Sequence, residues 1–215
     1  MQVLQLDKIR SVLCLGAHPD DIEIGCGATI KQLCDRRPDV RVDWIVFSGD
    51  ELRREEASQS AKAWLASVKT YNIVVHDFRD GFFPSQYEAI KNAIHETSRD
   101  VNPDVVFTHR LEDRHQDHRL LAEISWNAFR KQLILEYEIP KYEGDLGHPN
   151  VYSPLSEEEV RIKINRLIQY FPSQICKPWF DEMLFTAQMR LRGIESASMS
   201  KFAEAFHVRK CVIGW

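Results

Sequence analysis

The chain has 215 residues, of which 44% are hydrophobic and 28% charged, and its formal net charge is −4 at pH 7. This length suits one α/β domain with a sizeable core, and we predict a single domain over residues 1–215. The slight negative charge argues against nucleic acid as the main partner, since such proteins usually carry a basic face.

Short apolar runs alternate with helical patterns along the first 131 residues. Strands are predicted at 11–17, 40–47, 73–75 and 104–108. Helices are predicted from composition and apolar spacing at 25–35, 53–67, 86–98 and 114–131. Such alternation indicates βαβ units and a parallel sheet. We therefore predict an α/β, Rossmann-like three-layer sandwich with a mostly parallel sheet in the order 3-2-1-4 and onward.

The rest of the chain has weaker signals. Residues 137–154 are rich in Pro, Gly, Tyr and charged residues and predict a loop-rich segment of the same domain. A helix is predicted over 156–171, with Ser156 as N-cap and Glu159 completing a capping box. A helix over 180–191 and a strand over 205–213 follow, and we predict that residues 156–215 complete the substrate cleft of the same domain.

The cysteines and the N-terminal segment bear on the compartment. Five cysteines are present, an odd number without a C-x-x-C pair, which fits reduced thiols better than a disulfide framework. The N-terminus lacks the apolar core of a signal peptide, and no apolar run approaches the roughly 20 residues that span a bilayer. We expect a cytoplasmic protein without membrane insertion.

Two clusters of metal-ligand side chains each follow a predicted strand. His18-Pro19-Asp20-Asp21 follows the first strand, and residues 109–118 (HRLEDRHQDH) follow the fourth. Alone, each is also typical of a turn or a solvated helix start. Strands 1 and 4 are neighbours in the predicted order, however, and ligands of such sheets bind beyond the C-terminal strand ends. Because imidazole and carboxylate suit zinc, we predict one Zn²⁺ per chain there.

The number of ligands fits a catalytic ion, which takes three protein ligands and keeps one position open. His18, Asp21 and one histidine of the second cluster supply three. His115 and His118 are three residues apart. If Asp113 caps the following helix, they lie on one face, so that one can bind metal while the other faces the substrate.

Other side chains of the clusters have predicted roles around these ligands. Asp20 is left uncoordinated and is a natural general base. Asp113 and Asp117 can each hold a histidine in the correct tautomer. His109 opens the second cluster and is predicted to line the cleft. Cys26, between two glycines, is predicted to be a packed thiol rather than a soft metal ligand.

These motifs resemble the PIG-L/LmbE family of zinc-dependent N-acetylglucosamine deacetylases. The resemblance covers most of residues 11–130 and only parts of the C-terminal third. Ile22 and Gln116 depart from the family pattern, which usually has Glu and Pro at these positions. The resemblance rests on 17–21 (AHPDD), 25–30 (GCGATI) and 113–118 (DRHQDH), with support from 53–57 (RREEA) and 203–206 (AEAF).

The resemblance implies a ligand set and a base. His18, Asp21 and His118 would bind zinc, and Asp20 would be the general base that activates water.

The resemblance also implies roles beside the ligands. His115 would act as acid towards the leaving amine or stabilise the oxyanion, with Asp117 orienting it. Arg53 would contact the substrate, and the alternative for Arg53 is a surface ion pair with Glu55 or Glu56. Four further residues are candidates for lining the pocket, although aromatic residues at such spacing are more often helix core. They are Trp179, Phe180, Arg190 and Arg192.

The leading hypothesis is zinc-dependent hydrolysis of the N-acetyl group of an amino-sugar derivative (a glycoside, glycan or nucleotide-sugar), which releases acetate and a free amine. Its partner would be this small molecule, and the resemblance is compatible with a homo-oligomer. One alternative is a non-catalytic sugar-binding protein with a structural zinc, which would have no use for Asp20 and His115. Another is a different metallohydrolase, an esterase or phosphatase, acting on a sugar ligand.

Overall fold

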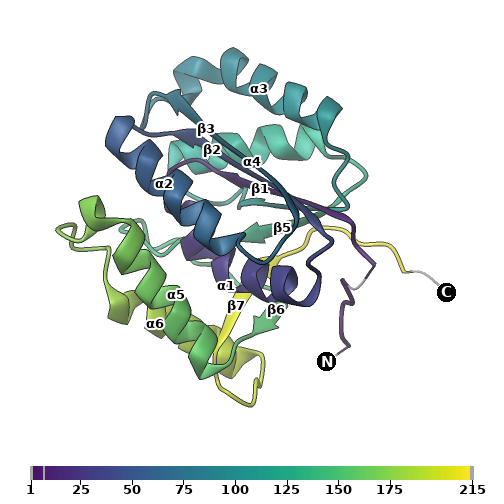
Figure 1. The fold of residues 1–215 in the computed structure, drawn as a ribbon, viewed down its shortest axis with the longest axis vertical. Helices are drawn as coiled ribbons and strands as arrows, with labels where there is room; N and C mark the ends of the chain where they lie inside the picture. Colours follow the sequence, from purple (N-terminus) through teal and green to yellow (C-terminus); the bar gives the residue numbers. More distant parts are fainter. Residues whose placement is uncertain (1, 7, 214–215) are drawn as a thin grey trace.

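A seven-stranded sheet forms the centre of the computed structural model, which describes residues 2–6 and 8–213 (Figure 1). The strand order is β3-β2-β1-β4-β5-β7-β6, and the first five strands of this order pair in parallel. The last two pair antiparallel. The predicted order 3-2-1-4 and the mostly parallel sheet are therefore confirmed. The strands are β1 Ser11–Gly16, β2 Arg41–Ser48, β3 Thr70–Phe78, β4 Val105–His109, β5 Leu133–Tyr137, β6 Val151–Pro154 and β7 Ala203–His207.

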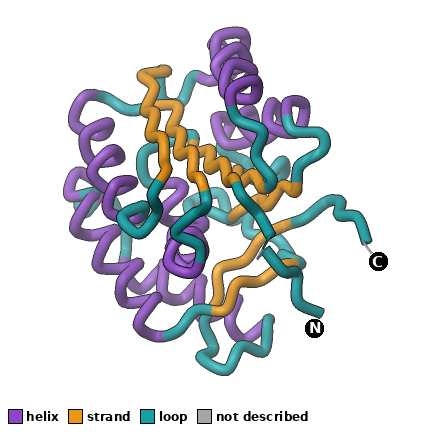
Figure 2. Tube along the Cα trace, turned by 45° about the vertical axis from the view of Figure 1, so that its right-hand side comes forward, coloured by secondary structure: helices purple, strands orange, loops and turns teal. Residues whose placement is uncertain are grey.

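Helices cover both faces of the twisted sheet, which gives the predicted three layers (Figure 2). One apolar core joins the sheet to α1, α2, α5 and α6, and a second joins its other face to α3 and α4. Strand β1 is buried along nearly its whole length, as expected where both faces are covered. The helices are α1 Asp21–Arg36, α2 Glu51–Trp64, α3 Tyr87–Asp100, α4 Gln116–Ala128, α5 Glu157–Tyr170 and α6 Glu182–Glu195, with short 3₁₀ turns at Phe83–Gln86 and Pro172–Gln174.

Several element boundaries differ from prediction. Helix α1 begins at Asp21 rather than at 25, because acidic side chains suit the first turn of a helix. Helix α4 ends at Ala128, and the apolar run that follows is strand β5, which was not predicted. Strand β6 lies inside the predicted loop-rich segment, and β7 ends at His207 rather than at 213.

The predicted capping box in the C-terminal half is confirmed. Ser156 and Glu159 form the predicted capping box at the start of α5. All five cysteines are free thiols, and Cys14, Cys26 and Cys34 are buried. Among the described residues, no helix combines the length and apolar character that crossing a membrane requires.

A buried ion pair ties the C-terminal segment to α1. Lys163 Nζ on α5 lies 2.6 Å from Glu204 Oε1 on β7, and both side chains are almost fully buried. Glu204 also accepts hydrogen bonds from the backbone N–H groups of Ala28 and Thr29, at 3.0 and 2.7 Å. Lys163 donates a second hydrogen bond to the carbonyl of Ile24. Strand β7 and α5 therefore hold the helix whose first turn enters the metal-ligand cluster.

We expect Lys163→Ala to lower the free energy of unfolding by about 3 kcal/mol, because it leaves the buried carboxylate of Glu204 without its cation. Urea unfolding measures this change. Arg161→Ala on the same helix is the control: its side chain is 71% exposed, and we expect a change within about 0.5 kcal/mol. Equal effects of the two variants would contradict a stabilising role for the Lys163–Glu204 pair.

Candidate active site

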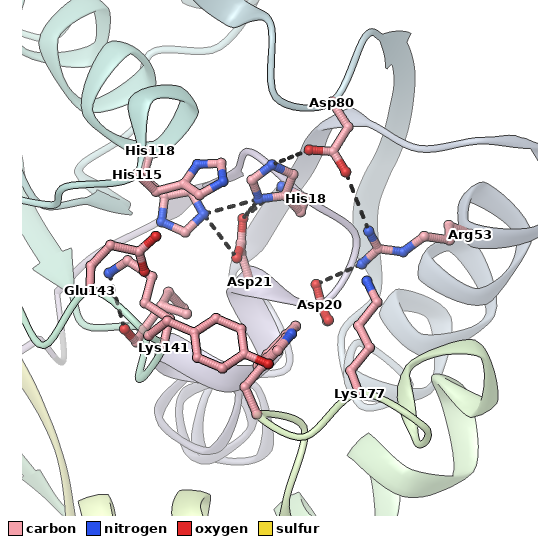
Figure 3. Close-up of a pocket in the computed structure, with 13 residues that line it drawn as sticks. His18, Asp20, Asp21, Arg53, Asp80, His115, His118, Lys141, Glu143 and Lys177 are labelled. Atoms are coloured by element: carbon pink, nitrogen blue, oxygen red, sulfur yellow. Dashed lines mark hydrogen bonds and ion pairs between the residues drawn. The ribbon is translucent and has the colours of Figure 1, made fainter.

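The two clusters meet at one edge of the sheet. Strands β1 and β4 are neighbours and run in parallel, with Cys14 opposite Phe107. Their C-terminal ends therefore lie at the same edge, where α1 and α4 begin. A pocket of about 270 Å³ opens there (Figure 3). Six of the eight predicted site residues line it, namely His18, Asp20, Asp21, Arg53, His115 and His118.

The three predicted metal ligands converge on one point. His18 Nδ1 lies 3.0 Å from His118 Nε2 and 3.2 Å from Asp21 Oδ2, and His118 Nε2 lies 3.5 Å from Asp21 Oδ1. Ligand atoms of a tetrahedral zinc with bonds of about 2.0–2.1 Å are roughly 3.3 Å apart. The donor set therefore fits a zinc-type ion in both chemistry and spacing.

In His18 and His118, one ring nitrogen faces the centre of the ligand set (the near nitrogen) and the other points away from it (the far nitrogen). A carboxylate contacts the far nitrogen of each ring. His118 Nδ1 is 3.0 Å from Asp113 Oδ2. His18 Nε2 is 3.1 Å from Asp80 Oδ1 and 3.4 Å from Asp117 Oδ2. These contacts favour protons on the far nitrogens, so that the near nitrogens present lone pairs to the centre. Metal-binding histidines commonly have such carboxylate partners.

The charges around the site favour a cation at its centre. Burial opposes a charge on His18, yet the carboxylates of Asp21, Asp117 and Asp80 raise its pKa well above the usual range. Burial and the neighbouring His109 lower the pKa of His118 to about 3. The His118 imidazole is thus neutral, and its Nε2 can accept a hydrogen bond or bind a cation. The position between His18 Nδ1 and His118 Nε2 therefore suits a proton or a metal ion.

Asp20 is a buried carboxylate outside the ligand set. It is the N-cap residue of α1, but its side chain makes no capping hydrogen bond. Instead, Oδ1 lies 2.9 Å from Arg53 Nη2, and Oδ2 has no hydrogen-bond partner among the described residues. Burial raises the pKa of Asp20, while Arg53 opposes this effect. Oδ2 is therefore available to take a proton from a bound water.

Arg53 points into the pocket from the first turn of α2. Asp50 caps this helix and accepts a hydrogen bond from the Arg53 backbone N–H at 2.9 Å. The guanidinium pairs with Asp20 and lies 3.9 Å from Asp80. The predicted alternative, a surface pair with Glu55 or Glu56, is wrong, because this helix face is turned toward the strand ends.

His109 was predicted to line the cleft, and this prediction is wrong. It is the last residue of β4, and its side chain lies below the pocket rather than in its wall. It is fully buried. Its ring stacks on that of His118, with centroids 3.9 Å apart and planes at 14°. Nε2 accepts a hydrogen bond from the Ala17 N–H at 3.0 Å and lies 3.2 Å from Asp21 Oδ2. His109 thus supports His118 and Asp21 from beneath.

Asp117 contacts His18 rather than His115. Its carboxylate accepts hydrogen bonds from the backbone N–H groups of Gly81 and Phe83, at 2.6 and 3.0 Å. These bonds turn the side chain toward the loop after β3, and the predicted orientation of His115 by Asp117 is therefore wrong. Asp117 fixes that loop and one side of His18.

Asp113 also differs from prediction, since His115 and not Asp113 is the N-cap residue of α4. The Asp113 carboxylate accepts from the His115 backbone N–H at 2.8 Å, from His118, and from Lys141 Nζ at 2.9 Å. His115 still lies on the pocket wall, with its ring 4.5 Å from that of His118. Burial and the nearby His18 lower its pKa, which favours the neutral form of its imidazole.

Residues 13–129 match the family described as PIG-L, GlcNAc-PI de-N-acetylase. The chain belongs to the PIG-L family. A PIG-L relative in Escherichia coli K12, named uncharacterized deacetylase YaiS, is 31% identical over 173 residues, which cover 75% of this chain and 90% of that protein.

Solved structures share the PIG-L fold. The N,N'-diacetylchitobiose deacetylase from Pyrococcus horikoshii is 22% identical with a TM-score of 0.71, over 94% of this chain and 84% of that one. The 4-carboxy-2-hydroxymuconate hydratase GalB from Pseudomonas putida KT2440 is 17% identical with a TM-score of 0.75, over 96% and 98%. Since a deacetylase and a hydratase share this architecture, the fold alone does not fix the reaction.

Several pocket residues were not predicted. One of them is Asp80, which follows β3 at the same sheet edge as the two clusters. Its position shortly after a predicted strand is the sequence signal that could have identified it. The others lie beyond the region matched to the PIG-L family, in segments without periodicity. They are Ile139, Lys141, Tyr142, Glu143 and Lys177.

Of the four C-terminal candidates for the pocket, only Trp179 lines it. Phe180 belongs to the core. Arg192 is buried in an ion pair with Glu138, and Arg190 lies over the ring of Phe202. Cys26 is a packed thiol that donates to the Ile22 carbonyl, as predicted.

Proposed function

We propose that this protein is a metal-dependent N-deacetylase that hydrolyses the N-acetyl group of an amino-sugar derivative and releases acetate and a free amine. The observation that carries the proposal is a three-donor centre beside a buried carboxylate, Asp20, whose Oδ2 has no partner among the described residues. Membership of the PIG-L family and the deacetylase names of its relatives support the same reaction.

His18, Asp21 and His118 would hold one divalent ion, with zinc favoured by two imidazoles and one carboxylate. When bound, the ion would polarise the acetyl carbonyl and make a water molecule more acidic. Asp113 holds the far nitrogen of His118, while Asp80 holds that of His18, so both rings are oriented before the ion arrives.

The chain's own residues would move the protons. Asp20 Oδ2 takes a proton from the attacking water, while Arg53 holds Oδ1 and fixes the direction of the carboxylate. Burial lowers the pKa of His115 and favours its neutral form, in which the ring N–H can donate to the developing oxyanion. When the C–N bond breaks, the amine needs a proton, which Asp20 can return because it took one from the water, while His115 keeps its hydrogen bond to the oxyanion.

Two alternatives predict different results. A sugar-binding protein with a structural ion would bind N-acetyl sugars without releasing acetate. An esterase or phosphatase would prefer O-acetylated or phosphorylated sugars. A panel of N-acetylated, O-acetylated and phosphorylated sugars, assayed for acetate and phosphate with zinc-loaded protein, separates these outcomes. Acetate from the N-acetylated members supports the proposal, and release only from the other two classes overturns it.

We also propose that residues 1–215 act as one catalytic domain. Strands β6 and β7 extend the same sheet as β1 to β5. The loop after β5 supplies Lys141 to the pocket, and the segment before α6 supplies Lys177. The region beyond the family match therefore completes the cleft.

We expect Asp80→Asn to weaken zinc binding about tenfold, because carboxylates behind metal-bound histidines typically contribute 10–100-fold to affinity. Competition with a chromophoric chelator measures the affinity. Asp77→Asn is the control: Asp77 is an exposed residue of β3 and does not line the pocket. If Asp80→Asn raised KM and left zinc affinity unchanged, Asp80 would instead serve the substrate.

A further inference from the structure

Lys177 brings a positive charge into the pocket without an acidic partner. Its side chain lines the pocket, and Figure 3 shows it pointing toward the Arg53 guanidinium and Asp20. It forms neither an ion pair nor a side-chain hydrogen bond with the residues that the structure describes. The other pocket lysine differs, since Lys141 is bound to Asp113 and Asp145 at 2.9 and 2.8 Å.

The helix that supplies Arg53 also fixes the segment that carries Lys177. Glu56 lies one turn after Arg53 on α2 and is 7% exposed. Its carboxylate accepts hydrogen bonds from the Ser173 backbone N–H at 2.9 Å and from Ser173 Oγ at 2.6 Å. The Lys177 N–H in turn donates to the Gln174 carbonyl at 2.9 Å. These contacts therefore fix the position of the Lys177 main chain relative to Arg53 on α2.

The two cations on this wall of the pocket differ in their partners. Arg53 forms an ion pair with Asp20 and lies 3.9 Å from Asp80, while Lys177 forms no ion pair with the residues that the structure describes. Adjacent cations on one wall attract carboxylate and phosphate groups, to which they donate charge-assisted hydrogen bonds. Trp179 also lines the pocket and packs edge-on against Phe180, with centroids 5.6 Å apart. It gives an apolar surface beside the cation, which suits the C–H face of a sugar ring.

We propose that Lys177, beside Arg53 and Trp179, forms a subsite for an anionic group, a carboxylate or a phosphate, carried by the substrate. The identity of that substrate as an N-acetylated amino sugar rests on the proposed function, while the anion subsite itself does not. The enzyme would then select acidic amino-sugar derivatives over neutral ones.

Kinetics test this selectivity with four sugars: N-acetylglucosamine, its 1-phosphate, its 6-phosphate, and N-acetylmuramic acid. We expect the wild type to prefer at least one of the anionic sugars in kcat/KM, and the preferred one distinguishes phosphate from carboxylate. Lys177→Ala should lower the preference about tenfold, mainly through KM, as expected for one charge-assisted hydrogen bond. Lys177→Arg should restore most of it. Lys62→Ala, which removes an exposed charge of α2 outside the pocket, should leave the preference unchanged.

A binding measurement separates failure of this inference from failure of the deacetylase proposal. Calorimetry compares glucosamine 6-phosphate, glucosamine 1-phosphate and muramic acid with glucosamine on the wild type and on Lys177→Ala, and it needs no turnover. If no sugar releases acetate but an anionic ligand binds more tightly through Lys177, only the proposed reaction fails. The anion subsite is overturned if no anionic ligand binds better than glucosamine, or if Lys177→Ala changes neutral and anionic ligands by the same factor.

Discussion

Asp20→Asn is expected to lower kcat by a factor of about 10²–10⁴, the usual contribution of a general base, while one metal ion per chain stays bound. The substitution keeps the shape of the side chain and its contact to Arg53 but removes the basic oxygen. Metal should be retained because the converging donor atoms come from His18, Asp21 and His118. Steady-state acetate release and metal analysis of the same preparation measure both quantities.

The companion variant Asp20→Ala also removes the partner of Arg53 and should be at least as inactive. Near-normal turnover in either variant would show that Asp20 is not the base. Loss of metal together with activity would place Asp20 among the ligands instead. Thermal melting shows whether the variants remain folded, which matters because Asp20 is buried.

Asp21→Ala is expected to abolish stoichiometric metal binding and, with it, activity. Asp21 offers the only carboxylate of the proposed ligand set, and a site with two imidazoles alone lacks the third protein ligand that zinc normally requires. The pKa of Asp21 is held well below its usual range, since the attraction of His118, His109 and His18 outweighs the effect of burial. A carboxylate with these neighbours is ready to bind a cation. Metal analysis after dialysis gives the stoichiometry.

Asp21 also accepts a hydrogen bond from the His18 backbone N–H at 2.6 Å, so Asp21→Ala alone could act through the fold. His118→Ala is therefore a second variant, which removes a different ligand and leaves this turn intact. Both should lose metal while their melting curves stay cooperative. One ion per chain in both variants would refute the proposed ligand set.

Local patterns were enough to predict how the two clusters meet. The apolar run ending at Gly16 and the run ending at His109 both have the length and composition of buried strands. Each is followed at once by imidazole and carboxylate side chains, so the strand order alone brings them to one edge of the sheet. The capping box at Ser156 is similarly a signal contained within four residues.

Local sequence patterns did not predict features that depend on packing between distant parts of the chain. His109 opens the second cluster in sequence, but its side chain is fully buried and its ring stacks beneath that of His118. The Asp117 side chain is oriented by hydrogen bonds from the backbone N–H groups of Gly81 and Phe83, and no local sequence pattern predicts these bonds. Lys177 reaches the pocket through a contact between Glu56 and Ser173, which are 117 residues apart.

The contact between Glu204 and α1 has a consequence for the order of events during protein synthesis. The ribosome makes Ala28 and Thr29 about 175 residues before the carboxylate that holds them. Until β7 has emerged, α1 lacks this anchor, and the turn that carries Asp20 and Asp21 lacks its final support. Completion of the cleft is thus a late step of folding, as is common when distant parts of a chain must come together. We expect nascent chains that end before β7 to bind zinc poorly.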